Sequence, residues 1–166
     1  LPPLALYVHI PWCLKKCPYC DFNSHELSPG APSTVPRPVA VAGPRGSAGA
    51  VPFGAGSRGA LPEARYLDAL VADLEASLPL VWGRRVSSVF IGGGTPSLFS
   101  PQGIERLIAD VRARLPLEAG CEITLEANPG TFEAERFHAF RAAGVTRLSV
   151  GVQSFDDGAL ERIGRV

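Results

Sequence analysis

Three cysteines lie within eight residues near the start of the chain. Cys13, Cys17 and Cys20 are spaced four and then three residues apart, so a short loop can bring all three thiolates to one small object. Thiolate is the soft ligand that iron–sulfur chemistry selects. A four-iron cluster held by three cysteines leaves one iron without a protein ligand. The pattern therefore predicts an iron–sulfur cluster whose open iron can bind another molecule.

Two other uses of the cysteines fit the sequence less well. A zinc site normally needs four ligands, often from two Cys-x2-Cys pairs, and only Cys17 and Cys20 form such a pair. The fourth cysteine, Cys121, lies in an apolar run and is expected to be a core residue. A disulfide framework suits secreted proteins, and three clustered thiols cannot all pair. The cluster is the favoured interpretation.

The elements that must position these cysteines are strands alternating with helices. The apolar run 4–10 predicts a buried strand directly before the cysteine loop, and further strands are expected at 86–91, 121–126 and 147–152. Ser100, Thr131 and Asp156 are expected to cap helices, and Gly144 to end one. Such alternation predicts about four parallel βα units in an open, incomplete barrel. Active sites of such folds lie at the carboxyl ends of the strands.

Residues 28–62 differ in composition from the rest of the chain. These 35 residues contain 7 prolines, 7 glycines, three arginines and no acidic residue. Such a segment cannot bury enough apolar surface to offset the entropy of ordering it. We therefore predict three segments: the first strand and cysteine loop at 1–27, a disordered Pro/Gly-rich insertion at 28–62, and the continuation of the domain at 63–166, incomplete at its C-terminus.

Composition narrows the classes of function. The formal net charge is zero and 46% of residues are hydrophobic, so the chain carries neither a basic nucleic-acid footprint nor an attraction to anionic membranes. Its longest apolar runs are too short to span a bilayer. Clustered free cysteines without an export signal predict a reducing, cytoplasmic location. Any association with a membrane is expected only through a partner protein.

The residues around the cysteines resemble a known family. Cys-x3-Cys-x2-Cys after a strand is the signature of radical S-adenosylmethionine (SAM) enzymes, and the runs 7–13 and 20–24 are similar to the coproporphyrinogen oxidase-related branch, closest to its heme chaperones. The resemblance covers nearly the whole chain apart from the insertion. It implies a partial parallel (β/α) barrel of the radical SAM type. Because that barrel typically has six units, it also implies that this chain is the N-terminal part of a longer protein.

The resemblance implies a site as well. Cys13, Cys17 and Cys20 would hold a [4Fe–4S] cluster, whose open iron binds the amino and carboxylate groups of SAM and whose electron splits SAM into methionine and a 5′-deoxyadenosyl radical. No residue is assigned as catalytic, because the cofactors carry the chemistry. The residues assigned to SAM by resemblance are Tyr7, Tyr19, Gly93, Gly94, Thr95, Glu126, Gln153 and Arg165.

The residues themselves leave several structural alternatives open. Gly92–Gly94 allow close backbone approach to a ligand but could form only a tight turn. Glu126 ends a strand, where a carboxylate needs a partner, and Arg147 could supply it. Tyr19 could simply pack. His9 could ligate heme, although a lone histidine in a strand is more often a hydrogen-bonded core residue.

Two function classes follow from the resemblance. The coproporphyrinogen oxidases carry an additional cysteine just past the third ligand, whereas this chain has Phe22 there. That difference favours a heme chaperone, which binds heme, the cluster and SAM and passes heme to an unidentified acceptor protein. The alternative is an oxygen-independent coproporphyrinogen III oxidase. A truncated product without activity is a third reading.

Overall fold

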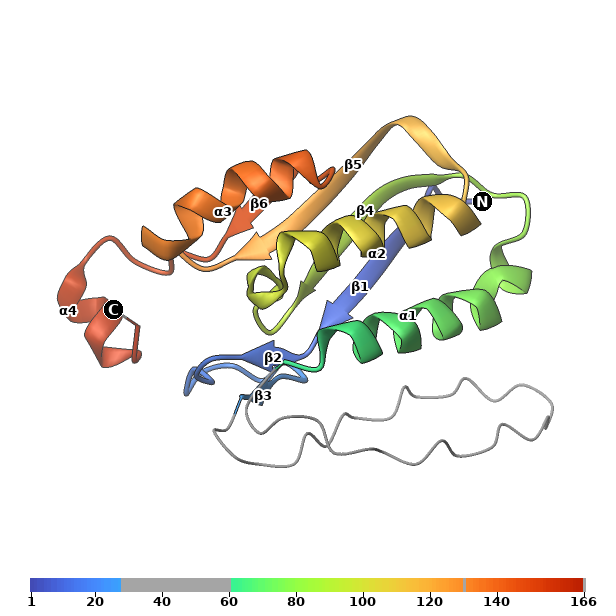
Figure 1. Cartoon of the computed structure of the whole chain (residues 1–166). Helices are drawn as coiled ribbons and strands as arrows, with labels where there is room; N and C mark the ends of the chain where they lie inside the picture. Colours follow the sequence, from blue (N-terminus) through green and yellow to red (C-terminus); the bar gives the residue numbers. More distant parts are fainter. Residues whose placement is uncertain (28–60, 130, 166) are drawn as a thin grey trace, which may run out of the picture.

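Four parallel strands form the sheet on which the site is built. The computed structural model describes residues 1–27, 61–129 and 131–165, with the side chains of 131–135 outside that description. The strands lie in the order β1-β4-β5-β6, so each is next to its predecessor in that sheet. The sheet is open, with β1 and β6 at its edges (Figure 1). Its strands are β1 Leu4–Ile10, β4 Val86–Gly93, β5 Leu117–Ala127 and β6 Arg147–Val150.

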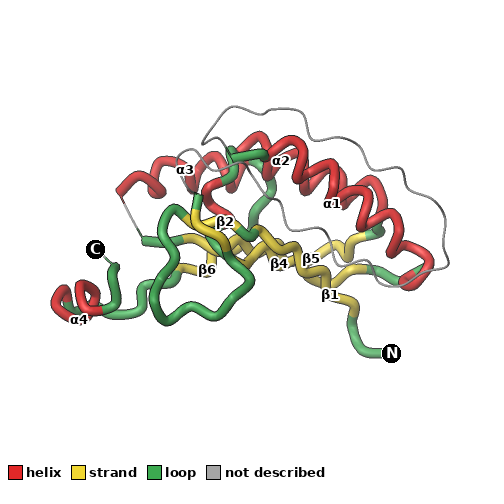
Figure 2. Tube along the Cα trace, turned by 90° about the horizontal axis from the view of Figure 1, so that it is seen from below, coloured by secondary structure: helices red, strands yellow, loops and turns green. Residues whose placement is uncertain are grey.

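A helix follows each of these strands, which confirms the four predicted βα units. The first three helices lie along one face of the sheet (Figure 2). Two short 3-10 helices, η1 Leu78–Val81 and η2 Pro96–Leu98, occur in the connections. The α-helices are α1 Glu63–Ser77, α2 Pro101–Arg114, α3 Thr131–Ala142 and α4 Asp157–Arg162.

The helix boundaries follow the predicted signals. The Ser100 hydroxyl accepts a hydrogen bond from the Gly103 amide at 2.9 Å, and the Asp156 carboxylate accepts one from Ala159 at 2.6 Å. Gly144 follows α3 with φ +109°, a conformation that glycine adopts without steric cost. The structure begins α3 at Thr131 itself, so this residue lies in the first turn rather than before it.

The hydrophobic core lies between the sheet and the helices. Alternation along each strand turns one set of side chains towards the helices, and Ile10, Ile91 and Leu125 are fully buried there. In β1 only Val8 and Ile10 are buried, so the prediction of a buried strand is wrong for its first half. The reason is position, because β1 is an edge strand that has a neighbour on one side only. The other buried members include Leu67, Phe99, Ile104, Leu107, Ile108, Ile123 and Phe140.

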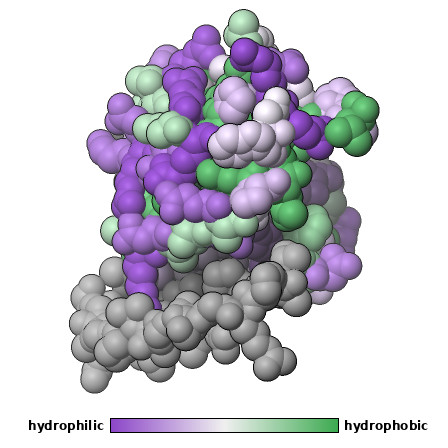
Figure 3. Space-filling model, turned by 90° about the vertical axis from the view of Figure 1, so that its right-hand side faces the viewer, coloured by the Kyte–Doolittle hydropathy of each residue, from purple (hydrophilic) through white to green (hydrophobic). Residues whose placement is uncertain are grey.

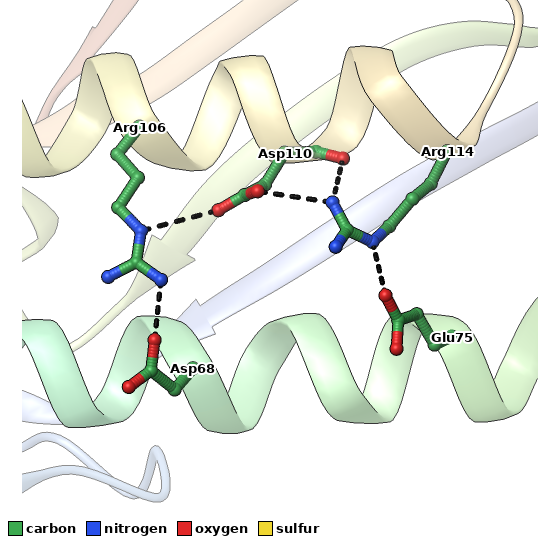
Figure 4. A network of polar contacts seen from close by, with 5 residues as sticks. All are labelled: Asp68, Glu75, Arg106, Asp110 and Arg114. Atoms are coloured by element: carbon green, nitrogen blue, oxygen red, sulfur yellow. Dashed lines mark hydrogen bonds and ion pairs between the residues drawn. The ribbon is translucent and has the colours of Figure 1, made fainter.

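Charged side chains join α1 to α2 across their exposed sides (Figure 4). Arg106 and Arg114 of α2 reach Asp68 and Glu75 of α1, and both arginines also contact Asp110 on their own helix. Their hydrogen bonds to Asp68 and Glu75 raise the pKa of each guanidinium. Exposed ion pairs each add little stability, so this network fixes the register of the two helices more than it holds them together.

Three strands differ in length from the prediction. Strand β4 continues to Gly93 and β5 runs from Leu117 to Ala127, both beyond their apolar runs, because pairing with parallel neighbours extends the ladder past the apolar residues. Strand β6 ends at Val150, two residues earlier than expected. Most of the predicted insertion 28–62 lies outside the described residues.

Both ends of the sheet carry exposed apolar side chains. At the end near η1, Leu80 and Trp82 are exposed, and Figure 3 shows hydrophobic and hydrophilic residues interspersed over that face. At the other end, exposed Leu14, Tyr19 and Phe22 belong to the cysteine loop. None of the helices in the described parts is long and apolar enough to cross a membrane.

Candidate functional site

The cysteine loop is closed at its base by a small second sheet that the sequence did not predict. Strand β2 (Trp12–Cys13) pairs in parallel with β3 (His25–Glu26). Two further bonds lock this base: the His25 amide donates to the Pro11 carbonyl at 2.7 Å and the Leu27 amide to the Cys13 carbonyl at 2.9 Å. The cysteine loop therefore begins and ends at this small sheet, directly after the end of β1.

Inside the loop, Lys16 and Ser24 hold the two sides together. The Lys16 ammonium donates to the Ser24 carbonyl at 3.1 Å, and the Lys16 amide lies 3.4 Å from a Glu26 carboxylate oxygen. Ser24 is buried, and its hydroxyl lies 3.8 Å from the Cys20 sulfur. These bonds fix a loop that has few apolar contacts of its own.

His9 ties the end of β1 to the cysteine loop. Its Nε2 lies 2.8 Å from the Asn23 carbonyl, which can only accept, so Nε2 carries the proton and donates. Nδ1 then accepts from the Tyr7 hydroxyl at 3.0 Å. Both ring nitrogens are thus bound within the protein. These contacts favour the structural interpretation of His9.

An aromatic cluster packs against the base of the cysteine loop. Trp12 contacts Tyr66 of α1 edge to face, with ring centroids 4.6 Å apart, and Phe99 lies 6.2 Å from Trp12. The Tyr66 hydroxyl donates to the His9 carbonyl at 2.7 Å. Burial raises the pKa of Tyr66 to about 12, with smaller contributions from Tyr7 and Asp73. The phenol therefore stays protonated and can serve as this donor.

Removing that donor should loosen the junction between α1 and β1. We expect Tyr66→Phe to lower the free energy of unfolding by about 1 kcal/mol, the usual net value of one hydrogen bond, because the ring contacts with Trp12 and Phe99 remain. Chemical denaturation of the two proteins measures the difference. Tyr19→Phe is the matched control and should change stability less, because the hydrogen bond it removes, from the Tyr19 hydroxyl to Cys17, lies at a half-exposed side chain.

The glycine run sits where β4 meets the cysteine loop. The Gly94 amide donates to the Ile10 carbonyl and the Thr95 amide to the Trp12 carbonyl, each at 2.7 Å, and the Gly93 amide donates to Glu126 at 2.9 Å. A Cβ on Gly93 would lie 2.7 Å from the His9 ring. Glycine is thus needed here for close packing against β1 and the cysteine loop. From the sequence, the glycine run had been explained by approach to a ligand or by a tight turn.

One pocket brings most of the predicted residues together at the carboxyl end of the strands. The three clustered cysteines line it, and so do Tyr19, Gly93, Gly94, Thr95, Glu126, Gln153 and Arg165. Residues that the sequence did not assign to SAM also contribute to its wall, namely Lys15, Phe22, Pro96, Ala127, Asn128, Ser149 and Gly151. Among the predicted residues, Tyr7 does not line the pocket.

Glu126 faces this pocket rather than forming the ion pair with Arg147. Its Oε2 accepts the Gly93 amide, and Arg147 instead binds Glu122 at 2.6 Å. Arg147 is aligned with Thr124, so Glu122 and Glu126 lie two residues to either side of it. Glu126 is held by the Gly93 amide, and Glu122 is the partner that Arg147 binds. The alternative pairing of Glu126 with Arg147 is therefore wrong.

Arg165 lies beside the cysteine loop although it is close to the end of the sequence. Its guanidinium donates to the Gly151 carbonyl and to Asn128 Oδ1, the latter at 2.9 Å. Burial raises the pKa of the Cys17 thiol, but hydrogen bonds from Tyr19 and Arg165 and the charges of Arg165 and Lys15 outweigh it and lower this pKa. The pocket therefore favours a thiolate at Cys17.

Tyr7 and Gln153 sit differently from the expectation. Tyr7 is 57% exposed, stacks with Phe90 on the helix-free side of the sheet and donates a hydrogen bond to His9. Burial and, to a smaller extent, the charge of the pocket residue Glu126 raise the pKa of its phenol. Gln153 lies in the loop after β6 rather than at its end, with φ 69°. Such a conformation is uncommon for a residue with a side chain, and its side chain does reach the pocket.

Cys121 is separate from the other cysteines. It is half-buried on β5 and packs against the core rather than lying inside it, and it lines a different pocket with Arg112 and Glu118. Burial and the nearby Glu118 raise the pKa of its thiol. Cys121 thus contacts the core, as a core residue would, but it is only partly buried.

The chemistry of the donors fits an iron–sulfur cluster. All four cysteines are free thiols, and three of them share one pocket. In the described part of the chain, no three His, Cys, Asp or Glu side chains are placed to hold a single metal ion. A four-iron cluster makes a different demand, because each thiolate binds a separate iron at its own corner.

Comparison with known proteins adds independent information. The family model described as the Radical SAM superfamily matches residues 7–166. Heme chaperone HemW of Escherichia coli K12 is 46% identical over 166 residues, which cover 100% of this chain and 36% of that protein. The bovine protein named radical S-adenosyl methionine domain-containing protein 1, mitochondrial, is 40% identical over 97% of this chain and 29% of its own length.

A solved structure shares the fold. The coproporphyrinogen III oxidase HemN of Escherichia coli, described as a radical SAM enzyme, superposes with a TM-score of 0.72 at 31% identity, covering 99% of this chain and 31% of that one. The chain thus spans about a third of the length of these relatives. The match of the family model over nearly all of the sequence agrees with the parallel sheet and the cysteine spacing. The chain belongs to the radical SAM superfamily.

Proposed function

We propose that this chain forms the cluster- and SAM-binding part of a heme chaperone. The observation that carries the proposal is the shared pocket, which is lined by Cys13, Cys17 and Cys20 together with the glycine loop, Glu126 and Arg165. When bound, a [4Fe–4S] cluster supplies one electron to SAM. The chain's own residues bind and orient the two cofactors.

The polar groups of the pocket suit the ammonium and carboxylate groups of SAM. The amides of Gly93, Gly94 and Thr95 are all bound within the protein, so they are not free to bind an anionic group. The Glu126 carboxylate can accept from an ammonium group. The Arg165 guanidinium, which lines the same pocket, offers the opposite charge for an anionic group.

Phe22 favours the chaperone over the oxidase. It lines the pocket and is 61% exposed, at the place where the resemblance puts the additional cysteine of the oxidases. The chaperone relatives, at up to 46% identity, support the same choice. The structural likeness to the oxidase HemN keeps oxygen-independent coproporphyrinogen oxidation as the second candidate. Heme delivery to an acceptor protein and a cytoplasmic location, which suits reduced thiols, belong to the same proposal.

A paired assay on the complete protein separates the two functions. We expect stoichiometric binding of heme, read by absorbance titration, and no anaerobic conversion of coproporphyrinogen III with SAM and a reductant, read by chromatography. The reason is that the cluster ligands are present while the oxidase's additional cysteine is replaced by Phe22. Catalytic product formation without heme binding would overturn the chaperone and support the oxidase.

A further inference from the structure

Asn128 joins two residues of the pocket that come from distant parts of the chain. Its Nδ2 donates to the Thr95 hydroxyl at 3.3 Å and its Oδ1 accepts from the Arg165 guanidinium at 2.9 Å. A guanidinium can only donate, so the amide oxygen must face Arg165 and the nitrogen must face Thr95. The chemistry of the partners therefore fixes the orientation of this amide.

These contacts differ from those of an ordinary turn residue. The sequence Asn128-Pro129-Gly130 indicates a turn, in which an asparagine side chain usually bonds to the backbone near itself. Here the amide reaches across 33 residues to Thr95 and across 37 residues to Arg165. Both partners line the pocket, as Asn128 does. Neither bond belongs to a helix or to a strand ladder.

The two hydrogen bonds of Asn128 reach residues that lie beside different cysteines of the loop. Thr95 is buried, and its amide is bound to the Trp12 carbonyl next to Cys13. Arg165 also donates to the Gly151 carbonyl after β6 and hydrogen-bonds to Cys17. Asn128 thus connects the side of the loop that holds Cys13 with the cation that lies beside Cys17.

We propose that Asn128 is a positioning residue that holds the Arg165 guanidinium in the pocket by anchoring it to Thr95. The inference rests on the proposed binding of SAM and extends it by a residue that neither the cysteine motif nor the resemblance assigned. Without Asn128, Arg165 keeps its bond to the Gly151 carbonyl but loses the acceptor that the Asn128 amide oxygen supplies. The long side chain then gains rotamer freedom that SAM binding must remove.

Calorimetric titration of SAM into the reconstituted complete protein tests this role. We expect Asn128→Ala to weaken SAM about tenfold with iron content unchanged, the loss typical of one charge-assisted hydrogen bond. Asn128→Asp keeps an acceptor for Arg165, and its second oxygen can accept from the Thr95 hydroxyl, which can turn to donate. Both contacts of the anchor therefore remain, and affinity should stay within about threefold of the parent. The matched control is Gln102→Ala, which removes an exposed amide on α2 outside the pocket and should change nothing.

A second measurement does not depend on any ligand. In complete protein labelled with 15N-arginine, the side-chain signal assigned to Arg165 should be protected from exchange in the parent and in Asn128→Asp, and should broaden in Asn128→Ala. Absence of SAM binding in the parent would defeat the proposed function, while the arginine signal would still decide the role of Asn128. Unchanged affinity and an unchanged signal in Asn128→Ala would overturn the inference. If that variant does not fold, Asn128→Leu compared with Asn128→Asp gives the same contrast, and equal results for this pair would overturn it too.

Discussion

Alanine at Cys13, Cys17 or Cys20 should abolish the iron–sulfur cluster of the complete protein, whereas Cys121→Ala should leave it intact. The three motif cysteines line one pocket, and each thiolate would bind its own iron. Removing one leaves an iron without a ligand, and the remaining cysteine of this chain cannot replace it, because Cys121 lies on β5 and lines a different pocket.

Iron and acid-labile sulfide, counted after anaerobic reconstitution, measure the effect together with the visible absorbance of the cluster. Circular dichroism of each variant shows that the fold survives, which we expect because Cys17 and Cys20 are only half-buried. Full iron and sulfide in any of the three motif variants would contradict the assignment. Stoichiometric zinc without sulfide in the parent would instead support the zinc alternative.

Local patterns were enough to predict the framework of the fold. Strand β1 begins where its apolar run indicates and helix α2 where its cap indicates, because these elements depend on neighbours in sequence such as Ser100 and Gly103. The extensions of β4 and β5 could not be predicted in this way. They depend on pairing with a parallel strand, and the sequence of one strand does not contain that information.

The candidate site, too, was predicted where it depends on local sequence and missed where it depends on distant residues. The cysteine spacing and the glycine run are local and were found, while the supports of the loop were missed. Tyr66 bonds to the carbonyl of His9, 57 residues away, and Asn128 bonds to Arg165, 37 residues away. No periodicity or spacing links such pairs. An aromatic residue in the first turn of a helix and an asparagine before a proline are both ordinary features, so each was assigned to its local role.

The choice of partner for Glu126 shows what strand pairing alone leaves undecided. From the sequence, Arg147 was a reasonable partner, since both residues were expected on adjacent strands near the pocket. In the sheet, Arg147 is aligned with Thr124. Side chains on alternate residues share a face, so Glu122 and Glu126, two residues to either side of Thr124, lie on the same face as Arg147. The Gly93 amide of the neighbouring strand binds Glu126, and Arg147 binds Glu122.

The second large effect is expected at Gly94, where an added methyl group should displace the cysteine loop. A Cβ there would lie 2.6 Å from the Trp12 carbonyl oxygen and 3.0 Å from the Cys13 sulfur. The first contact is with backbone, which cannot rotate away, so β2 or the end of β4 must move. We expect Gly94→Ala to lose most of its cluster and about 1–3 kcal/mol of stability, the usual cost of overpacking.

Gly94 is a sharper test than Gly93, because Gly93 also has φ +120° and its replacement would combine backbone strain with a collision. The matched control is Gly120→Ala on β5, where a Cβ meets nothing within 4 Å. It should keep full iron content and equal or slightly higher stability, since alanine restricts the unfolded chain. Chemical denaturation and iron analysis of the two variants give the comparison. Normal cluster content in Gly94→Ala would mean that the loop tolerates a shift of Cys13, and that close packing of β4 against the loop is not what holds the cysteines in place.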